Sequence, residues 1–269
     1  MAKRATQSKA TETNAITVRE AAEVPDFMRQ HAGEGMEGMG QWRQTSRVKI
    51  IQAQTADELI DDFGVGTAII SPDSLIMAEY GEPVRLVPLF HYSSFALWRD
   101  NRDKDGLPVV EEVYNQTHPI AIKALNPAER EQPYDDGTNR LWRYVHHLNW
   151  VVEVQDGPAR GAVAIVSFDR GSYSTGRKFI NYLERREQKG APLYGNIVEL
   201  AVEKRTNRND DRFFVFEFGT PSDGAQYVTD PEELKRLRDA YLSIKEAYEQ
   251  GALRSAQDGQ QVDGSAEEA

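Results

Sequence analysis

Residues 162–187, "AVAIVSFDRGSYSTGRKFINYLERRE", come nearest in this sequence to a motif with known chemistry. The stretch runs from an apolar strand through a turn rich in Gly, Ser and Thr into a predicted helix. Gly171 and Gly176 bracket four residues, as in a nucleotide-binding P-loop, but Arg177 and Lys178 stand where that motif needs Lys and then Ser or Thr. The hydroxyl that would bind magnesium is missing, so nucleotide hydrolysis is not supported.

The physical part of the motif that remains is an anion site. Ser174 or Thr175 is the expected N-cap of the helix. Free N–H groups in the first turn of a helix favour an anion, and Arg170, Arg177 and Lys178 lie beside them in the sequence. A nucleic-acid phosphate would satisfy these groups without catalysis. The alternative, in which the three cations are solvated surface charges, remains open.

Aromatic and basic residues alternate in three further segments, "FHYSSFALWR", "LWRYVHHLNW" and "DRFFVFEF". Single strands are held by bases stacked on aromatic rings, at about 1–3 kcal/mol per base, with Lys and Arg following the backbone. The candidate stacking residues are Tyr92, Trp98, Trp142 and Tyr173, and the candidate basic contacts are Arg99, Arg143, Arg170, Arg177, Lys178, Lys204, Arg205 and Arg208. Aromatics at strand spacing are more often core residues, and Trp150, between Leu148 and Val152, is expected to be one.

Catalysis has no support in the residue pattern. His146 and His147 are adjacent on a predicted strand, so they point to opposite faces and do not share a metal. Asp135 and Asp136 lie in a "PYDDG" segment typical of a turn. The chain has no cysteine, which excludes disulfides and thiolate zinc sites. We expect a protein that is not an enzyme and has no metal and no cofactor.

Composition and charge limit the classes of protein to which the chain can belong. The 269 residues are 39% hydrophobic, enough for a core, and no apolar run reaches the roughly 18 residues of a membrane span. We expect no membrane partner and a cytoplasmic location, in a host cytoplasm if a phage encodes the chain. The net charge is −11, yet residues 137–218 carry a net of +3 and the remainder −14. A phosphate-binding face on an acidic protein is therefore allowed.

Short alternating apolar segments predict a mainly β fold, a small OB-like β-barrel with flanking helices. The expected strands are 47–53, 67–71, 84–92, 141–154, 162–168, 197–204 and 212–218, the last two joined by the loop "TNRND". Only two helices are predicted. One lies in the second half of residues 162–187. The other begins at Asp230, the expected N-cap, with Pro231 in the first turn and a capping box from Glu233, and it stops at Gly251.

The domain prediction has four parts. Residues 1–45 are a flexible N-terminal arm, 46–220 the OB-like barrel, 229–251 a C-terminal amphipathic helix and 252–269 a disordered acidic tail. Apolar residues recur in the helix at spacings of three and four: Leu234, Leu237, Tyr241, Ile244 and Tyr248. This stripe must be buried on the strand core or on another subunit. The second interpretation describes a non-catalytic structural or assembly protein that forms a homo-oligomer through this helix.

Three places together resemble phage-encoded single-stranded-DNA-binding proteins with an OB-type barrel. They are "RVKIIQ", "VRLVPLFHYSSFALWRD", and "AVAIVSFDRGSYSTGRKFINYL" followed by "YGNIVELAVEKRTNRNDDRFFVFEF". The resemblance implies cooperative, sequence-tolerant binding of single-stranded DNA in replication or recombination, with an acidic tail that recruits replication or recombination proteins. Such tails often end in an aromatic or apolar residue, whereas this chain ends "SAEEA". Competition of the tail with DNA for a basic groove is the alternative role.

Overall fold

The computed structural model describes residues 46–53, 55, 57–99, 109–135, 141–206, 210, 212–251 and 253. The chain divides into two units, residues 1–42 and 43–269, and all described residues belong to the second. The predicted arm 1–45, Arg208 and, apart from Leu253, the predicted acidic tail lie outside the described residues. The side chain of Arg99 also lies outside the described part of the structure.

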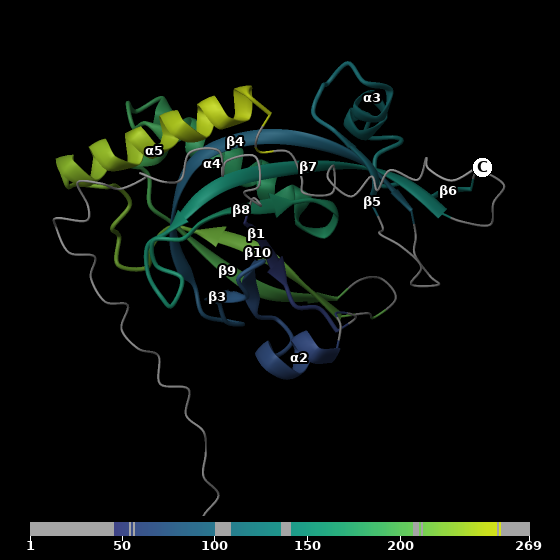
Figure 1. Ribbon diagram of the computed structural model, residues 1–269, viewed down its shortest axis with the longest axis horizontal. Helices are drawn as coiled ribbons and strands as arrows, with labels where there is room; N and C mark the ends of the chain where they lie inside the picture. Colours follow the sequence, from purple (N-terminus) through teal and green to yellow (C-terminus); the bar gives the residue numbers. More distant parts are fainter. Residues whose placement is uncertain are drawn as a thin grey trace, which may run out of the picture. The chain divides into compact units, whose positions relative to one another are not determined.

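The described chain is mainly β, as predicted, and its strands form one sheet (Figure 1). The strands are β1 (Arg47–Ile50), β2 (Ala68–Ser71), β3 (Leu75–Ala78), β4 (Val84–Arg99), β5 (Val109–Val113), β6 (Tyr134–Asp135), β7 (Leu141–Val154), β8 (Val163–Phe168), β9 (Val198–Thr206) and β10 (Arg212–Gly219). Their order is β10-β9-β4-β7-β8-β1-β2-β3, with β5 paired to β4 and β6 to β7. β1 and β8 pair in parallel, and the other neighbouring strands are antiparallel.

The described residues contain four α-helices where the sequence predicted two. They are α2 (Asp57–Phe63), α3 (Pro119–Leu125), α4 (Tyr173–Glu187) and α5 (Pro231–Glu249), with 3₁₀ turns η2 (Arg170–Ser172) and η3 (Leu193–Gly195). The prediction missed α2 and α3 because seven residues span only about two turns, too few for a 3.6-residue period to show. It also ended β4 at Tyr92, whereas the strand continues to Arg99.

The sheet curls until its two ends meet through side chains. Nε2 of Gln52, just after β1, donates to the Phe214 carbonyl at 2.8 Å, and its Oε1 accepts from the Phe214 N–H at 2.9 Å. Tyr80 meets the Phe214 ring edge-on at 5.4 Å and forms a β-bridge with Val202. The result is a curled half-barrel. Its ten strands exceed the five of an OB-fold, so the OB type stays a prediction.

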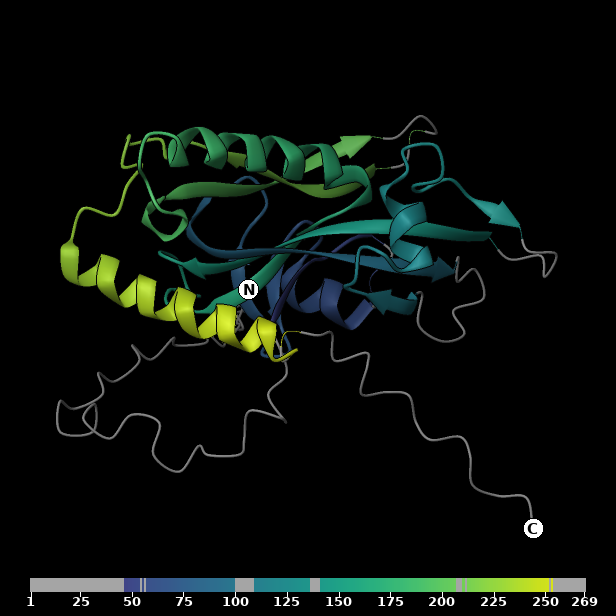
Figure 2. The same cartoon turned by 90° about the horizontal axis from the view of Figure 1, so that it is seen from above.

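α4 and α5 lie on opposite sides of the sheet (Figure 2). The main core gathers side chains of eight strands, and α4 adds Phe179 and Leu183 to it. On the other side, Leu237 of α5 is fully buried against Val87 and Leu89 of β4. The two long central strands, β4 and β7, are therefore held between helices.

α5 packs its apolar stripe on the sheet of its own chain. Ile244 and Tyr248 join the cluster around Tyr92, and Arg236 donates two hydrogen bonds to Glu153, whose side chain is buried on β7. The predicted N-cap is confirmed, since the Asp230 carboxylate accepts from the Glu232 N–H at 3.0 Å. The capping box is not formed. The stripe that suggested an intersubunit helix is thus used within one chain.

Candidate nucleic-acid interface

The pairing of β4 with β7 decides which predicted residues share a face. Trp98 lies directly opposite Arg143, and Arg99 lies opposite Trp142. Side chains opposite each other on paired strands point to the same face, and neighbours along a strand point to opposite faces. Trp98 and Arg143 therefore lie on one face and Trp142 on the other. Alternation along the predicted strand 141–154 already places Trp142 and Arg143 on opposite faces, and the pairing with β4 adds that Trp98 shares the face of Arg143.

The turn η2 brings Arg170 onto the Trp98 face. The Arg170 guanidinium carbon lies 5.1 Å from the Trp98 ring centroid, and Arg170 is exposed while Trp98 is half-buried. Beside them, His147 Nδ1 is 2.9 Å from Asp169 Oδ2, and the His147 ring lies 6.3 Å from Trp98. We call Trp98, Arg143, His147, Asp169 and Arg170 the Trp98 cluster.

Electrostatics keep the Asp169 carboxylate charged. Burial acts to raise the pKa of Asp169, but the hydrogen bond from His147 and the charges of His147 and Arg170 outweigh it, so the pKa lies below its usual value. The carboxylate fixes the His147 ring and stands next to Arg170. Arg143 and Arg170 carry two positive charges against the one negative charge of Asp169, so these three side chains have a net positive charge.

Tyr173 belongs to a separate network on the other face. Its hydroxyl is 2.9 Å from His146 Nδ1, and His146 Nε2 is 3.0 Å from Ser93 Oγ. Burial first, and then the charge of Arg130, lowers the pKa of His146 to about 4. The ring is neutral at pH 7, so one nitrogen donates and the other accepts. The Arg130 guanidinium also lies 4.2 Å from the Tyr173 ring centroid, so both the ring and the hydroxyl of this predicted stacking residue are engaged by its own network.

The predicted start of α4 is wrong. The helix begins at Tyr173, directly after η2, and the Tyr173 N–H donates to the Arg170 carbonyl. Thr175 is buried inside the first turn and donates to Glu217 Oε1 at 3.1 Å. Because η2 runs straight into α4, neither Ser174 nor Thr175 is the N-cap. The free N–H groups that we expected next to Ser174 are therefore not at the start of the helix.

Packing explains the two glycines of the P-loop-like stretch. A Cβ on Gly176 would lie 2.6 Å from Phe168 Cβ and 3.0 Å from Leu148 Cδ1. A Cβ on Gly171 would lie 2.8 Å from a Phe213 ring carbon. α4 and η2 approach the strands too closely for a side chain at either position. The spacing that resembles a phosphate loop therefore reflects contact between the helix and the sheet.

The remaining predicted cations are dispersed. Arg177 and Lys178 are exposed on α4 and form no ion pair with another described residue. Lys204 and Arg205 are neighbours on β9 and point to opposite faces. Arg205 is ion-paired with Glu217 and donates to the Gly171 carbonyl at 3.3 Å. Of the β9 pair, only Arg205 reaches η2.

Tyr92 is not part of an exposed surface, contrary to the prediction. It is 3% exposed, and the Tyr248 ring of α5 lies 5.2 Å from it. Burial raises the pKa of Tyr92 to about 12. α5 covers this part of β4, so the ring is unavailable to a base. The expectation for Trp150 is confirmed, since it is also 3% exposed.

Five residues of the two networks were not among the predicted site residues: Ser93, Arg130, His146, His147 and Asp169. The alternation of β7 separated His147 from His146, but nothing in the pattern paired His147 with Asp169, which lies 22 residues further along the chain. Arg130 lies in a segment where no element was predicted. These contacts depend on which strands are neighbours, which a local pattern does not contain.

A family model described as "Pam3 phage gp34-like protein" matches residues 14–249. No curated protein and no solved structure matches the chain. Within the described residues, no helix is long and apolar enough to cross a membrane.

Proposed function

Since the chain belongs to the Pam3 phage gp34-like family and is a phage protein, we propose that it binds single-stranded DNA, with little sequence preference, during replication or recombination of the phage. The proposal takes the half-barrel as an OB-like scaffold and the Trp98 cluster as the contact surface. It assigns no catalytic step to the chain.

The observation that carries the proposal is the Arg170 guanidinium 5.1 Å above the Trp98 ring, with Arg143 directly across the strand pair. A base stacked on the exposed part of the indole would extend this stack, and both arginines would be near its phosphates. Trp98 Nε1 is buried and has no hydrogen-bond partner in the described structure. The ring is thus held in place by packing, and a fixed ring loses little entropy on binding.

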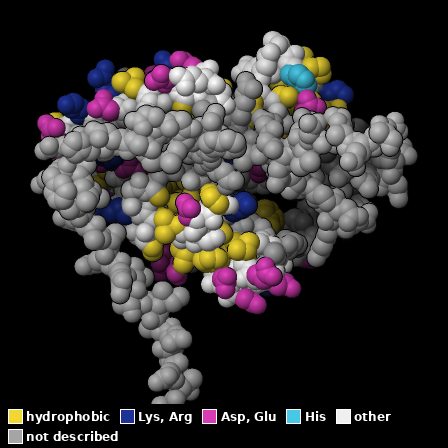
Figure 3. Space-filling view, viewed as in Figure 1, with side chains coloured by type: hydrophobic (Ala, Val, Ile, Leu, Met, Phe, Trp, Pro, Cys, Tyr) yellow, Lys and Arg dark blue, Asp and Glu magenta, His cyan; other side chains and the backbone are white. Residues whose placement is uncertain are grey.

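Charge on the surface supports binding at this end of the sheet. α2 carries Asp57, Glu58, Asp61 and Asp62 at the far edge, where Figure 3 shows a group of acidic side chains. Such a surface repels phosphates. The segment 137–218, with its net charge of +3, supplies β7, η2, α4 and β9. The basic segment therefore supplies the strand and the turn that carry Arg143 and Arg170.

The test is a titration of tryptophan fluorescence with oligo-dT and with a matched duplex across a salt series. We expect quenching by the single strand alone, weakening as salt rises. Trp98→Ala should reduce affinity by roughly tenfold, in line with about 1–3 kcal/mol per stacked base. Trp150→Phe, at a buried tryptophan, is the matched control and should leave affinity unchanged.

Arg170→Gln provides a second readout. Loss of one phosphate contact should reduce the slope of log affinity against log salt by about 0.7. Arg160→Gln makes the same charge change in the exposed β7–β8 turn, at the other end of these strands, and should not alter the slope. A wild-type protein that binds neither oligo-dT nor duplex would overturn the proposed function.

A further inference from the structure

One exposed side of α4 carries a row of cations that the Trp98 cluster does not include. Lys178, Arg185 and Lys189 are separated by seven and four residues, so they fall within about 40° of one another around the helix axis. Lys189 lies just past the last turn. All three are exposed, and none forms an ion pair with another described residue. The row is roughly 16 Å long. We call these three residues the α4 stripe.

The acids of α4 lie elsewhere on the helix. Glu184 and Glu187 fall more than about 100° from the centre of the stripe. Pairs of opposite charge at i,i+4 would indicate a solvated face held by local ion pairs. The stripe has instead a single sign along its length, which suits a polyanion.

A buried arginine lies beneath the end of the stripe. The Arg186 side chain donates to the Gln226 carbonyl at 2.8 Å, to Gln226 Oε1 at 2.6 Å and to Asn196 Oδ1 at 3.3 Å. The residue is 6% exposed, and no described carboxylate is paired with it. An unpaired charge in a medium of low dielectric constant adds to the positive potential of the surface above it.

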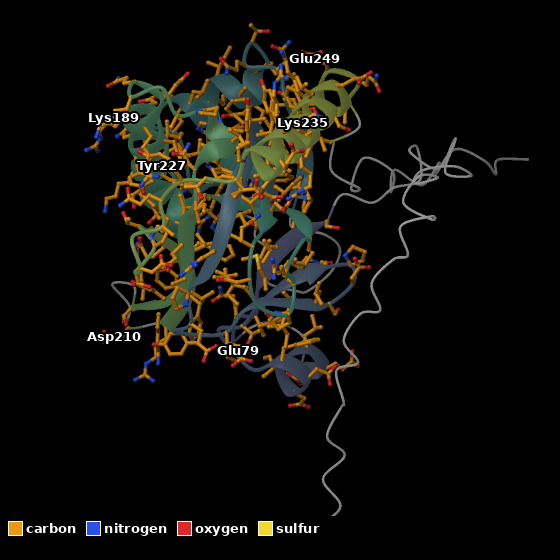
Figure 4. All side chains as sticks on the ribbon, turned by 90° about the vertical axis from the view of Figure 1, so that its left-hand side faces the viewer. Glu79, Lys189, Asp210, Tyr227, Lys235 and Glu249 are labelled. Carbon is orange, nitrogen blue, oxygen red and sulfur yellow. The ribbon has the colours of Figure 1, made fainter. Side chains whose placement is uncertain are left out.

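Arg186 also holds an exposed aromatic ring beside the stripe. Its guanidinium carbon lies 4.4 Å from the Tyr182 ring centroid and 4.9 Å from that of Tyr227. Tyr227 is 41% exposed. Figure 4 shows Tyr227 and Lys189 on the same side of the molecule, with Asp210 of the β9–β10 hairpin well away from them. A fixed, accessible ring next to a row of cations is the arrangement that holds single strands.

We propose that a single strand leaving the Trp98 cluster continues along α4, with its phosphates on the α4 stripe and a base on Tyr227. This inference rests on the proposed function and extends its contact surface. Arg170 lies on the Trp98 face and α4 on the opposite face of the sheet, and η2 joins the two. The strand would pass around η2 to reach α4, with Arg170 at one end of the helix and Lys189 at the other. Cations at a helix C-terminus also complement the macrodipole, but that role accounts for neither Lys178 in the first half nor the exposed tyrosine.

The decisive variant is Arg185→Gln with Lys189→Gln, measured on oligo-dT of two lengths. The short oligonucleotide spans only the Trp98 cluster, and the long one reaches the end of α4. For the long oligonucleotide we expect weaker binding and a salt slope reduced by about 1.4, or 0.7 for each lost contact. Affinity for the short oligonucleotide should not change.

The matched control is Lys235→Gln with Arg238→Gln, which removes the same charge from exposed positions of α5. Tyr227→Leu should weaken binding of the long oligonucleotide and leave the salt slope unchanged. If the wild type binds but the α4 variant behaves like the α5 control, or weakens both lengths equally, this inference is wrong while the proposed function survives. If the wild type binds no single strand, the proposed function itself fails.

Discussion

Arg170 is the residue at which the P-loop-like stretch and the aromatic strands meet. Its φ of 40° lies in the left-handed region, which side chains other than Gly, Asn and Asp rarely adopt. The conformation occurs where β8 turns into η2, and the side chain lies over Trp98. Strained backbone at a surface residue is often associated with function. This strain is consistent with the role we propose for Arg170.

One buried histidine, His146, and one half-buried histidine, His91, predict how stability depends on pH. Burial lowers the pKa of His91 to about 4, and burial with neighbouring positive charge lowers that of His146 to about 4. The unfolded chain has histidines with a pKa near 6.5 and binds more protons between pH 6.5 and 4. The free energy of unfolding should be highest above pH 6.5 and fall on acidification, by about 1 kcal/mol or more per histidine at pH 5. Urea unfolding at pH 7 and 5 measures this.

His91→Phe is the variant that isolates one contribution. His91 Nε2 is buried with no hydrogen-bond partner among the described residues, and the ring packs on Trp150 at 4.4 Å, so Phe preserves the contact. In this variant, the free energy of unfolding should fall less between pH 7 and pH 5 than it does in the wild type. His118→Asn, at a more exposed histidine, should retain it. An unchanged pH dependence in His91→Phe would contradict the assignment.

At the scale of elements, the Gly176→Ala variant tests whether Gly176 is needed for the close packing of α4 on the sheet. Gly176→Ala removes a residue with poor helix propensity, which in isolation would stabilise a helix. The added Cβ would meet Phe168 and Leu148 at 2.6 and 3.0 Å. We expect the free energy of unfolding to fall by about 1–3 kcal/mol, as for other overpacked cores. Thermal or urea denaturation measures it.

Ser174→Ala is the control on the same helix, because Ser174 is exposed and its change adds nothing to the core. It should change stability by less than about 0.5 kcal/mol. If Gly176→Ala were as stable as wild type but lost affinity for single strands, the phosphate-loop interpretation would return.

Elements were predictable where the pattern was long. The alternation of "LWRYVHHLNWVVEV" predicted β7 with its observed bounds, and Asp230 with Pro231 marked the start of α5. β3, β5, α2 and α3 were missed; each has only four to seven residues, and the local apolar pattern did not mark them as it marked the equally short β1 and β2. β4 was predicted too short because "FHYSSFALWR" mixes polar and aromatic residues. Its pairing with β7 continues the ladder through that stretch.

At the scale of the whole molecule, Gln52 closes the half-barrel. The side-chain amide of Gln52 bonds to the N–H and the C=O of Phe214, as a neighbouring strand would, although the two residues are 162 positions apart in the sequence. Gln52→Leu keeps the size of the side chain and leaves the Phe214 N–H and C=O without that partner. We expect a loss of about 1–3 kcal/mol in the free energy of unfolding, measured by urea denaturation.

Gln188→Leu is the matched control, since Gln188 is exposed at the end of α4 and its side chain makes no hydrogen bond to another described residue. Equal stability of the two variants would mean that the curl of the sheet does not depend on the Gln52 contact. Greater loss in Gln52→Leu would support closure by a side chain in place of a strand ladder.

The sequence by itself determined the period of each long element, the buried place of Trp150, the separation of His146 from His147 and the basic middle of an acidic chain. These are local properties, because alternation and charge are properties of consecutive residues. Only the tertiary structure decided that α5 covers Tyr92, that Arg170 lies over Trp98 and that Gly176 faces Phe168. Each of these depends on contacts between distant segments, and such contacts are selected by the packing of the whole core rather than by the neighbours of any one residue.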